Sequence, residues 1–469
     1  MSDDPALLPA TTLLERYRDG SLSPAEVTEA CLDRIARHND TLNAFNLVDH
    51  DGARAAAAES AKRWRLGAPR GRLDGVPTAI KDIVWAAGWP TLRGSLTVDP
   101  HQPWDEDSPA VARLRAHGAV LLGRTTTPEF GWKGVTDSPL TGITRNPWNP
   151  AKTPGGSSGG SAVAVASGMS ALALGTDGGG SIRIPAGFTG IFGHKPTFGR
   201  VPAYPPSPFG TLAHLGPMTR SVGDAALMLT VIAEGDPRDG LALRPDGSDY
   251  TQGLDGGVDG LKLAYSATLG GHKVKPEVAE RVRLAVRRFE ALGAEVEECD
   301  PEIPDCGPIF VCLWFAGAAA VVDKIDEAAR AKMDPGLLEV ARTGARYGLF
   351  DYLAAMRERD RVRSIMSRFH RRYDLLLTPS LPLTAFDVGM DAPVDPHGES
   401  WANWTPFTYP FNMTGQPAAS IPCGLASDGL PVGLQIVGAR YADALVLRAA
   451  RAYETAHPFR MPEAPVAGS

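Results

Sequence analysis

Two clusters of glycine and serine constrain the fold of this 469-residue chain more than any other feature. The first spans residues 155–161 and contains Ser157, Ser158 and Ser161, and the second spans residues 178–181 and ends in Ser181, 24 positions after Ser157. Glycine has no Cβ atom, so the backbone of such a loop can approach a ligand and direct several N–H groups toward one point. Groups arranged in this way stabilise negative charge, either on a bound phosphate or on the oxyanion of a tetrahedral intermediate.

The segments around both clusters alternate between helical and extended patterns. A helix start is marked by Ser23 as the cap, Pro24 at the first position and Glu26 in a capping box. Helices are expected at residues 23–38, 51–65, 108–117, 276–292 and 443–455, after the first cluster up to about residue 167, and through most of 308–371. Strands are expected at residues 76–80, 120–122, 171–174, 375–378, 418–422 and 432–437. This alternation predicts an α/β sheet with helices on its faces.

Composition excludes several classes of protein. The chain is 43% hydrophobic and 22% charged with a net charge of −7, which supports a sizeable core and leaves no basic stripe for nucleic acid. Five cysteines without a CxxC pair argue against a disulfide framework and a zinc knuckle, and favour a reducing compartment. The N-terminus is acidic, and the longest largely apolar run, residues 306–322, is too short to span a bilayer. We therefore expect a cytoplasmic protein with neither a membrane nor a nucleic-acid partner.

Three other interpretations of the glycine clusters are weaker. Gly155 and Gly160 have the spacing of a phosphate-binding loop, but Ser161 stands where that loop needs lysine and no strand precedes it. Residues 155–159 match the nucleophile elbow of α/β-hydrolases, which must follow a strand, whereas this segment follows proline-rich turns. The third interpretation, that both clusters are flexible connections, does not explain so many glycines interleaved with serines.

A serine nucleophile needs a group that accepts its proton. Neither cluster contains histidine and no metal-ligand spacing is present, so lysine is the remaining candidate base. Lys81 directly follows the apolar residues 76–80, where a surface lysine is least expected. Burial would favour its neutral form, but a salt bridge to the adjacent Asp82 is an equally good interpretation of the sequence.

With these residues in view, the chain resembles the amidase signature family from about residue 5 to 458, most closely over 70–220. The motif consists of residues 155–161, the string Gly-Thr-Asp-Gly-Gly-Gly-Ser-Ile-Arg-Ile-Pro at 175–185, and Gly-Ile-Phe-Gly-His-Lys-Pro-Thr at 190–197. The resemblance implies a Ser-cis-Ser-Lys triad. In this triad Ser181 is the nucleophile, Ser157 is the bridging serine after a cis peptide bond, and Lys81 is the base.

The resemblance also implies the surroundings of the triad. The N–H groups of the second cluster would form the oxyanion hole, from Gly178, Gly179, Gly180 and Ser181. Supporting roles would fall to Ser158, Thr176, Asp177 and Arg183. No metal or organic cofactor is expected, and the partners are a small-molecule amide and water, with a homodimer as the expected assembly.

For the fold, the resemblance implies a single α/β domain over residues 1–469 with a central mixed, mostly parallel twisted sheet covered by helices. Residues 70–220 would form the signature core. Residues 235–370 would form a variable, mostly helical region on the substrate side. Residues 371–460 would return strands to the sheet and supply the C-terminal helix.

The expected reaction is hydrolysis of an amide C–N bond. Thr405 stands where the A-type subunits of glutamyl-tRNA amidotransferases carry the aspartate that binds the amino group of glutamine, so an amidotransferase-type glutaminase is the alternative. Aromatic residues favour a pocket for an apolar or aryl amide or anilide, or for an ester or carbamate, and the candidates are Trp314, Phe315, Trp401, Trp404 and Phe407. A non-catalytic binding protein on the same scaffold is disfavoured because Lys81, Ser157 and Ser181 are all present.

Overall fold

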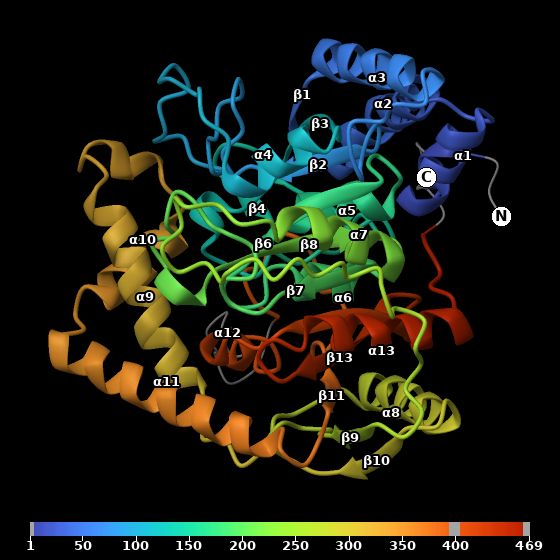
Figure 1. Cartoon of the computed structure of the whole chain (residues 1–469). Helices are drawn as coiled ribbons and strands as arrows, with labels where there is room; N and C mark the ends of the chain where they lie inside the picture. The colour runs from blue at the N-terminus through green and yellow to red at the C-terminus, as the bar shows by residue number, and fades with distance from the viewer. Residues whose placement is uncertain (1–3, 394–403, 463–469) are drawn as a thin grey trace.

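The computed structural model describes residues 4–393 and 404–462, and its centre is one large mixed β-sheet (Figure 1). Within these residues the sheet has eleven strands in the order β1-β3-β2-β6-β8-β7-β12-β13-β11-β9-β10. Their bounds are β1 (Phe45–Val48), β2 (Pro77–Lys81), β3 (Val120–Thr125), β6 (Leu172–Asp177), β7 (Phe192–Lys195), β8 (His214–Thr219), β9 (Lys262–Tyr265), β10 (Glu295–Glu298), β11 (Leu375–Pro379), β12 (Ala418–Leu425) and β13 (Pro431–Gly438). A separate hairpin pairs β4 (Asp137–Ser138) with β5 (Gly142–Ile143).

The sheet corrects the expectation of a mostly parallel arrangement. Strands β3, β2 and β6 are parallel near one edge and β11, β9 and β10 are parallel at the other. Between these groups all pairings are antiparallel, from β6 through β8, β7, β12 and β13 to β11, and β1 pairs antiparallel with β3 at its edge. Only a short turn joins β12 to β13, and such a connection can link antiparallel strands only.

Helices surround the sheet as the alternating pattern predicts. Their bounds are α1 (Ala10–Asp19), α2 (Pro24–Leu42), α3 (His50–Arg65), α4 (Pro109–Ala116), α5 (Gly159–Ala166), α6 (Arg183–Thr189), α7 (Val222–Ile232), α8 (Pro276–Ala291), α9 (Gly307–Asp323), α10 (Pro335–Gly344), α11 (Leu349–Phe369), α12 (Pro410–Thr414) and α13 (Asp443–Ala456). Single turns of 3₁₀-helix are η1 (Pro5–Leu7), η2 (Glu129–Gly131), η3 (Gly210–Leu212) and η4 (Ala329–Lys332). The capping box at Ser23 and Glu26 is formed as predicted.

Two of these helices follow the glycine–serine clusters and are buried on all sides. Every residue of α5, which begins just after Ser158, is buried, and so is every residue of α6, which begins two residues after Ser181. Both helices pack against strands of the sheet, α5 on β6 and β8 and α6 on β12 and β13. The two serine loops are therefore anchored to the buried centre of the fold.

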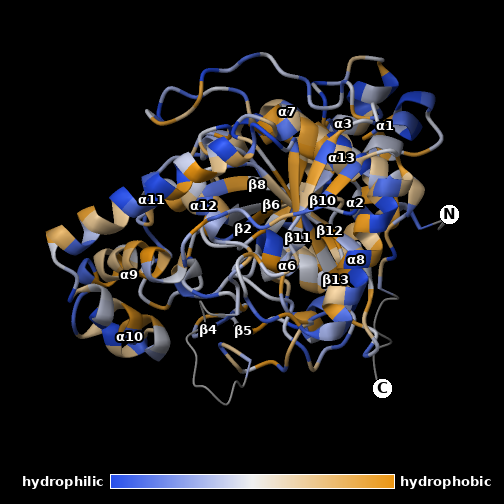
Figure 2. Cartoon of the chain, turned by 90° about the horizontal axis from the view of Figure 1, so that it is seen from below, coloured by the Kyte–Doolittle hydropathy of each residue, from blue (hydrophilic) through white to orange (hydrophobic). Residues whose placement is uncertain are grey.

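Helices α9, α10 and α11 lie together at one side of the molecule, away from the hydrophobic strands at its centre (Figure 2). They share a core of their own, built around Phe310, Leu313, Leu337 and Val362. The region 235–370 that contains them also supplies β9 and β10 to the sheet. No helix in the described part of the chain is long and apolar enough to cross a membrane.

Candidate active site

Lys81 lies at the end of the interior strand β2, where the sheet and the helices exclude water. All five residues of β2 are buried, because this strand runs between β3 and β6. The Lys81 Nζ atom lies 2.7 Å from Ser157 Oγ, 2.9 Å from Ser158 Oγ and 2.8 Å from Thr176 Oγ1. Three hydroxyl groups thus surround an amine that is fully withdrawn from solvent.

Asp82 does not neutralise this lysine. Its carboxylate accepts hydrogen bonds from the Asn46 side chain at 2.9 Å and the Leu92 amide at 3.0 Å, and lies 3.8 Å from Arg124 Nε. The structure thus favours the first of the two interpretations of Lys81. Burial lowers the pKa of Lys81 well below its usual value, and the more distant charge of Asp177 offsets only part of that effect.

The two serine clusters meet beside Lys81. The peptide bond between Gly156 and Ser157 is cis, as the family resemblance implies. The Ser158 amide donates to the Ser181 carbonyl at 3.1 Å, and the Ser158 hydroxyl donates to the Thr176 carbonyl at 3.0 Å. Ser158 therefore ties the first cluster to the second.

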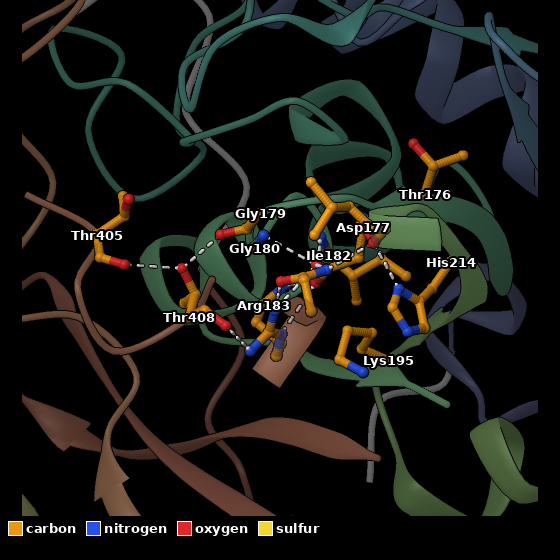
Figure 3. A network of polar contacts seen from close by, with 12 residues as sticks. Thr176, Asp177, Gly179, Gly180, Ile182, Arg183, Lys195, His214, Thr405 and Thr408 are labelled. Atoms are coloured by element: carbon orange, nitrogen blue, oxygen red, sulfur yellow. Dashed lines mark hydrogen bonds and ion pairs between the residues drawn. The ribbon is translucent and has the colours of Figure 1, made fainter. Parts of the chain in front are cut away.

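Asp177 shapes the second cluster by accepting hydrogen bonds from its backbone and from Arg183 (Figure 3). Its carboxylate accepts from the amides of Gly180 at 2.8 Å and Ile182 at 3.2 Å. Arg183 donates to it through Nε at 3.0 Å and Nη2 at 2.9 Å, and both side chains are fully buried. Burial alone would raise the pKa of Asp177, but the Arg183 guanidinium outweighs it, so the pKa is lowered and the carboxylate stays ionised.

Arg183 is held in turn by residues from the C-terminal part of the chain. Its Nη1 donates to the Thr408 carbonyl and the Gln435 side chain, both at 2.8 Å, and its Nη2 donates to the Asn412 side chain at 2.6 Å. Thr408 also donates from its hydroxyl to the Gly179 carbonyl at 2.6 Å (Figure 3). This network joins the loop to α12 and β13 and keeps its backbone in one geometry.

The loop needs glycine because aromatic side chains press on it. A Cβ atom at Gly178 would lie 2.7 Å from Trp314 Cζ3, and one at Gly179 would lie 2.7 Å from Phe310 Cζ. Gly180 has a φ of +136°, which side chains rarely tolerate. Its amide is already bonded to Asp177, whereas the amides of Gly178, Gly179 and Ser181 have no acceptor among the described residues.

The hydroxyl groups of Ser157 and Ser181 open onto a shared cavity. Thr176, Gly178 and Trp314 also line it, and its remaining walls come from residues 83–85, 130–131, 203–209 and 213–215 together with Arg93 and Ser108. Ser157 is 2% exposed and Ser181 7%, so a reacting group would meet both serines almost free of bulk water. A buried amine, two adjacent serines and unpaired amides can support acyl transfer.

Comparisons with known proteins show the family to which the chain belongs. The family model described as Amidase matches residues 26–447. The acylamidase of Rhodococcus erythropolis is 37% identical, with 96% of each chain aligned. This chain belongs to the amidase signature family.

Further relatives include the A-type subunit of the glutamyl-tRNA(Gln) amidotransferase of Thermosynechococcus vestitus, which is 36% identical over 93% of this chain and 95% of that protein. Among solved structures, a bacterial aryl acylamidase of the amidase signature family superimposes with a TM-score of 0.90 at 35% identity, covering 96% of both chains. The protein is thus a hydrolytic amidase that acts on amide C–N bonds.

The pocket residues expected from the sequence have different positions in this amidase. Trp314 lines the cavity, and its ring stacks on Phe209 with 3.8 Å between ring centroids. The other described candidates pack in hydrophobic cores outside the cavity lining: Phe315 with α9 and α10, Trp404 against Phe188, and Phe407 in the core that contains Phe411. Trp401 lies outside the described residues.

Most of the cavity wall was not predicted from the sequence. Phe130, Tyr204 and Phe209 line the cavity, and none of them belongs to a glycine–serine cluster. The one usable signal was residues 203–209, where three prolines lie between two aromatic residues. Such a segment has few backbone donors and resists regular structure, which suits a cavity wall.

Two further buried bases lie beneath the loop (Figure 3). Lys195 donates to the carbonyls of Pro196 and Gln416, and burial lowers its pKa well below the usual range. His214 bonds through Nδ1 to the Leu212 carbonyl at 2.8 Å, and burial also lowers its pKa. In the described parts of the chain, no three His, Cys, Asp or Glu residues are grouped to hold a metal ion.

Proposed function

We propose that this enzyme hydrolyses apolar or aryl amides through an acyl-enzyme on Ser181, with Ser157 as the bridging serine and Lys81 as the base. The observation that carries the proposal is the contact of 2.7 Å between Lys81 Nζ and Ser157 Oγ, made by an amine that is fully buried. A base in this position needs no metal and no organic cofactor.

The hydrogen-bond partners of Lys81 are compatible with a neutral amine. A neutral amine has two N–H donors and one lone pair, and it has three hydroxyl neighbours. The Ser158 hydroxyl donates to the Thr176 carbonyl and so can only accept from Lys81. The lone pair is then available for the proton of Ser157.

The reaction follows from these positions. Neutral Lys81 takes the proton of Ser157, and Ser157 takes the proton of Ser181 as its oxygen attacks the amide carbonyl. The unpaired amides of Gly178, Gly179 and Ser181 stabilise the oxyanion, each worth about 3 kcal/mol by analogy with other oxyanion holes. Ser157 then returns the proton to the leaving amine, and water hydrolyses the acyl-enzyme.

Gly180 is a weaker donor to the oxyanion than its neighbours, since Asp177 already accepts its amide hydrogen. Asp177 and Arg183 support the site by fixing the loop, while Ser158 and Thr176 hold the amine of Lys81. None of these four needs to touch the substrate for the chemistry.

The lining of the cavity supports an apolar or aryl substrate. Phe130, Phe209, Trp314 and Leu215 present carbon surface to the reacting serines. Anilides, esters and carbamates share the acyl group that such a surface would bind. The bacterial aryl acylamidase that this chain resembles is named for substrates of the same kind.

An amidotransferase-type glutaminase is the second candidate, because relatives of that name are about as similar to this chain. Glutamine carries an α-ammonium group that needs an anionic partner. No aspartate or glutamate lines the cavity within the described residues. Thr405 is buried and also lies outside the lining.

A substrate panel tests the proposal. Acetanilide, 4-nitroacetanilide, phenyl acetate and glutamine would be assayed with the wild-type enzyme, Ser181→Ala and Ser161→Ala. Ser161 is a matched control, because its buried hydroxyl bonds to Thr125 at 2.7 Å, away from the cavity lining. We expect Ser181→Ala to lose at least about 1,000-fold in kcat on anilides while Ser161→Ala stays active.

Activity confined to glutamine would overturn the substrate class, and turnover by Ser181→Ala would overturn the mechanism. We also propose that the enzyme is a cytoplasmic homodimer that acts on small molecules. Light scattering on the purified protein tests the dimer.

A further inference from the structure

Arg93 lines the active-site cavity, and its charge is not neutralised there. The side chain is half-buried, and its guanidinium makes no hydrogen bond or ion pair with any described residue. The carboxylate that acts on it through space is Asp82, but the Asp82 oxygens accept from Asn46 and from the Leu92 amide. Burial lowers the pKa of Arg93, yet an arginine keeps its proton at neutral pH.

The backbone holds Arg93 firmly at this wall. Arg93 has a φ of 57° and Phe130 a φ of 52°, both in the left-handed region that residues with a Cβ atom rarely adopt. The Phe130 amide donates to the Arg93 carbonyl at 2.7 Å, and both residues line the cavity. The next residue is Gly94, where a Cβ atom would lie 2.6 Å from the Thr127 carbonyl. Such unfavourable conformations persist only where the surroundings enforce them, and they concentrate at functional sites.

The Arg93 wall is connected to the reacting serines. Residue 131 follows Phe130, and a Cβ atom at Gly131 would lie 3.3 Å from Ser157 Oγ and 2.8 Å from Ile83 Cδ1. A substrate held at the serines is therefore bordered by this wall.

The cavity as a whole favours negative charge. Its described lining contains no aspartate or glutamate, and His214, which also lines it, is held neutral by burial. Arg93 thus supplies the single formal charge of the described lining, inside walls that are otherwise largely apolar. A guanidinium in such a setting forms strong paired hydrogen bonds with a carboxylate.

Building on the proposed hydrolysis at Ser181, we propose that the substrate of this amidase carries a carboxylate, bound by Arg93, in addition to its apolar surface. The substrate class is then an amide whose acyl or amine part bears an acid group. Arg93 acts as a specificity residue: it binds the distant end of the substrate and takes no part in the proton transfers.

The test compares charged amides with neutral amides of the same shape. One pair has the acid on the amine part, 4-acetamidobenzoate against 4-isopropylacetanilide. The other has it on the acyl part, glutaric acid monoanilide against N-phenylhexanamide. Each pair is measured as a ratio of kcat/KM values with the wild-type enzyme, Arg93→Gln and Arg93→Lys.

Arg238→Gln is the matched control. Arg238 lies 5.2 Å from the ring centroid of Tyr204 at the same cavity wall, but Asp236 and Glu106 neutralise it at 2.7 Å each. Removing this guanidinium changes the overall charge as much as removing Arg93, without removing the unpartnered cation.

We expect the wild-type enzyme to prefer the acid in at least one pair. Arg93→Gln should reduce that preference roughly 10- to 100-fold, because the loss of a hydrogen bond to a charged group weakens binding by about this factor. Rates on the neutral members should change little, Arg93→Lys should keep part of the preference, and Arg238→Gln should keep all of it. If Arg93 had only a structural role, Arg93→Gln would lower kcat/KM equally for both members of a pair.

Equal ratios in wild-type and Arg93→Gln for both pairs would overturn this proposal and leave the proposed function standing. Failure of the wild-type enzyme to hydrolyse any anilide would overturn both. If Arg93→Gln fails to fold, the substrate preference of the wild-type enzyme tests the proposal by itself. It should rank 4-acetamidobenzoate or glutaric acid monoanilide above its neutral partner and 4-(aminomethyl)acetanilide below, and any other order contradicts the proposal.

Discussion

Replacing Lys81 by methionine tests whether the amine is neutral inside the folded protein. Methionine has similar length and fits the apolar end of β2, but it cannot bind a proton. If Lys81 is neutral when folded and protonated when unfolded, unfolding of the wild-type protein takes up one proton that unfolding of Lys81→Met does not. The lowered pKa of Lys81 thus becomes a difference in the pH dependence of stability.

The size of this difference can be worked out. Because the unfolded wild-type protein binds one more proton at Lys81 than the folded protein, its free energy of unfolding rises with pH, relative to that of Lys81→Met, by about 1.4 kcal/mol per unit until the pH reaches the ordinary lysine pKa of about 10.4. For 469 residues the entropy of unfolding is roughly 1 kcal/mol/K, so one pH unit corresponds to about 1.4 °C in Tm. Between pH 7 and pH 10 the Tm of Lys81→Met should fall relative to wild type by about 4 °C.

The lost hydrogen bonds of Lys81 add a pH-independent term. Ser158 keeps its bonds to the backbone of Thr176, which limits that loss to about 1 kcal/mol for each of the other hydroxyls. This term shifts both ends of the pH series equally and leaves the slope unchanged.

The assay is differential scanning calorimetry at a fixed scan rate from pH 7 to pH 10. The control is Lys62→Met, since Lys62 is 57% exposed and pairs with Glu59 on α3. It should show no such slope. A Tm difference between wild type and Lys81→Met that stays constant within about 1 °C across this range would refute the neutral amine.

Three further changes test the site. The kcat/KM of the wild-type enzyme should rise with pH along a one-proton limb, because only neutral Lys81 accepts a proton. The midpoint of this limb should lie below the ordinary lysine pKa. A midpoint at or above about 10.4 would contradict Lys81 as the base. Asp177→Asn leaves Arg183 buried without its carboxylate, so calorimetry should find a Tm lower by about 3–5 °C, and an unchanged Tm would contradict the ion pair. Gly178→Ala puts a methyl group 2.7 Å from Trp314 and should lower kcat at least about tenfold. Adding Trp314→Ala should restore part of this kcat. If the two substitutions instead change kcat independently of each other, the contact between these residues is contradicted.

The helices and the two loops were predictable because their signals are local. The cap at Ser23 and Glu26 and the glycines before Ser181 act within a few residues of themselves. The antiparallel centre of the sheet was not predictable in the same way. Strand β8 carries Gly216 and Pro217, which are rare in strands, and only its pairing with β6 and β7 makes it extended.

The surroundings of the amine and the cavity depend on contacts between distant segments. Adjacent residues of a strand point to opposite faces, but Asp82 lies just past the end of β2, so this rule did not decide between a neutral Lys81 and a pair with Asp82. Trp314 and Phe209 are far apart in sequence and meet only through the packing of α9. Composition alone could not distinguish these rings from Phe407, which belongs to a core.

The central claim, that Ser181 is the nucleophile activated through Ser157 and Lys81, is tested most directly by covalent labelling. A fluorophosphonate reacts with an activated serine, and peptide mass spectrometry locates the adduct. We predict a single adduct on Ser181 in the wild-type enzyme, a rate of labelling that falls at least about 100-fold in Lys81→Met, and no adduct in Ser181→Ala. An adduct on Ser157 or another serine, or labelling that is as fast without Lys81, would contradict the account.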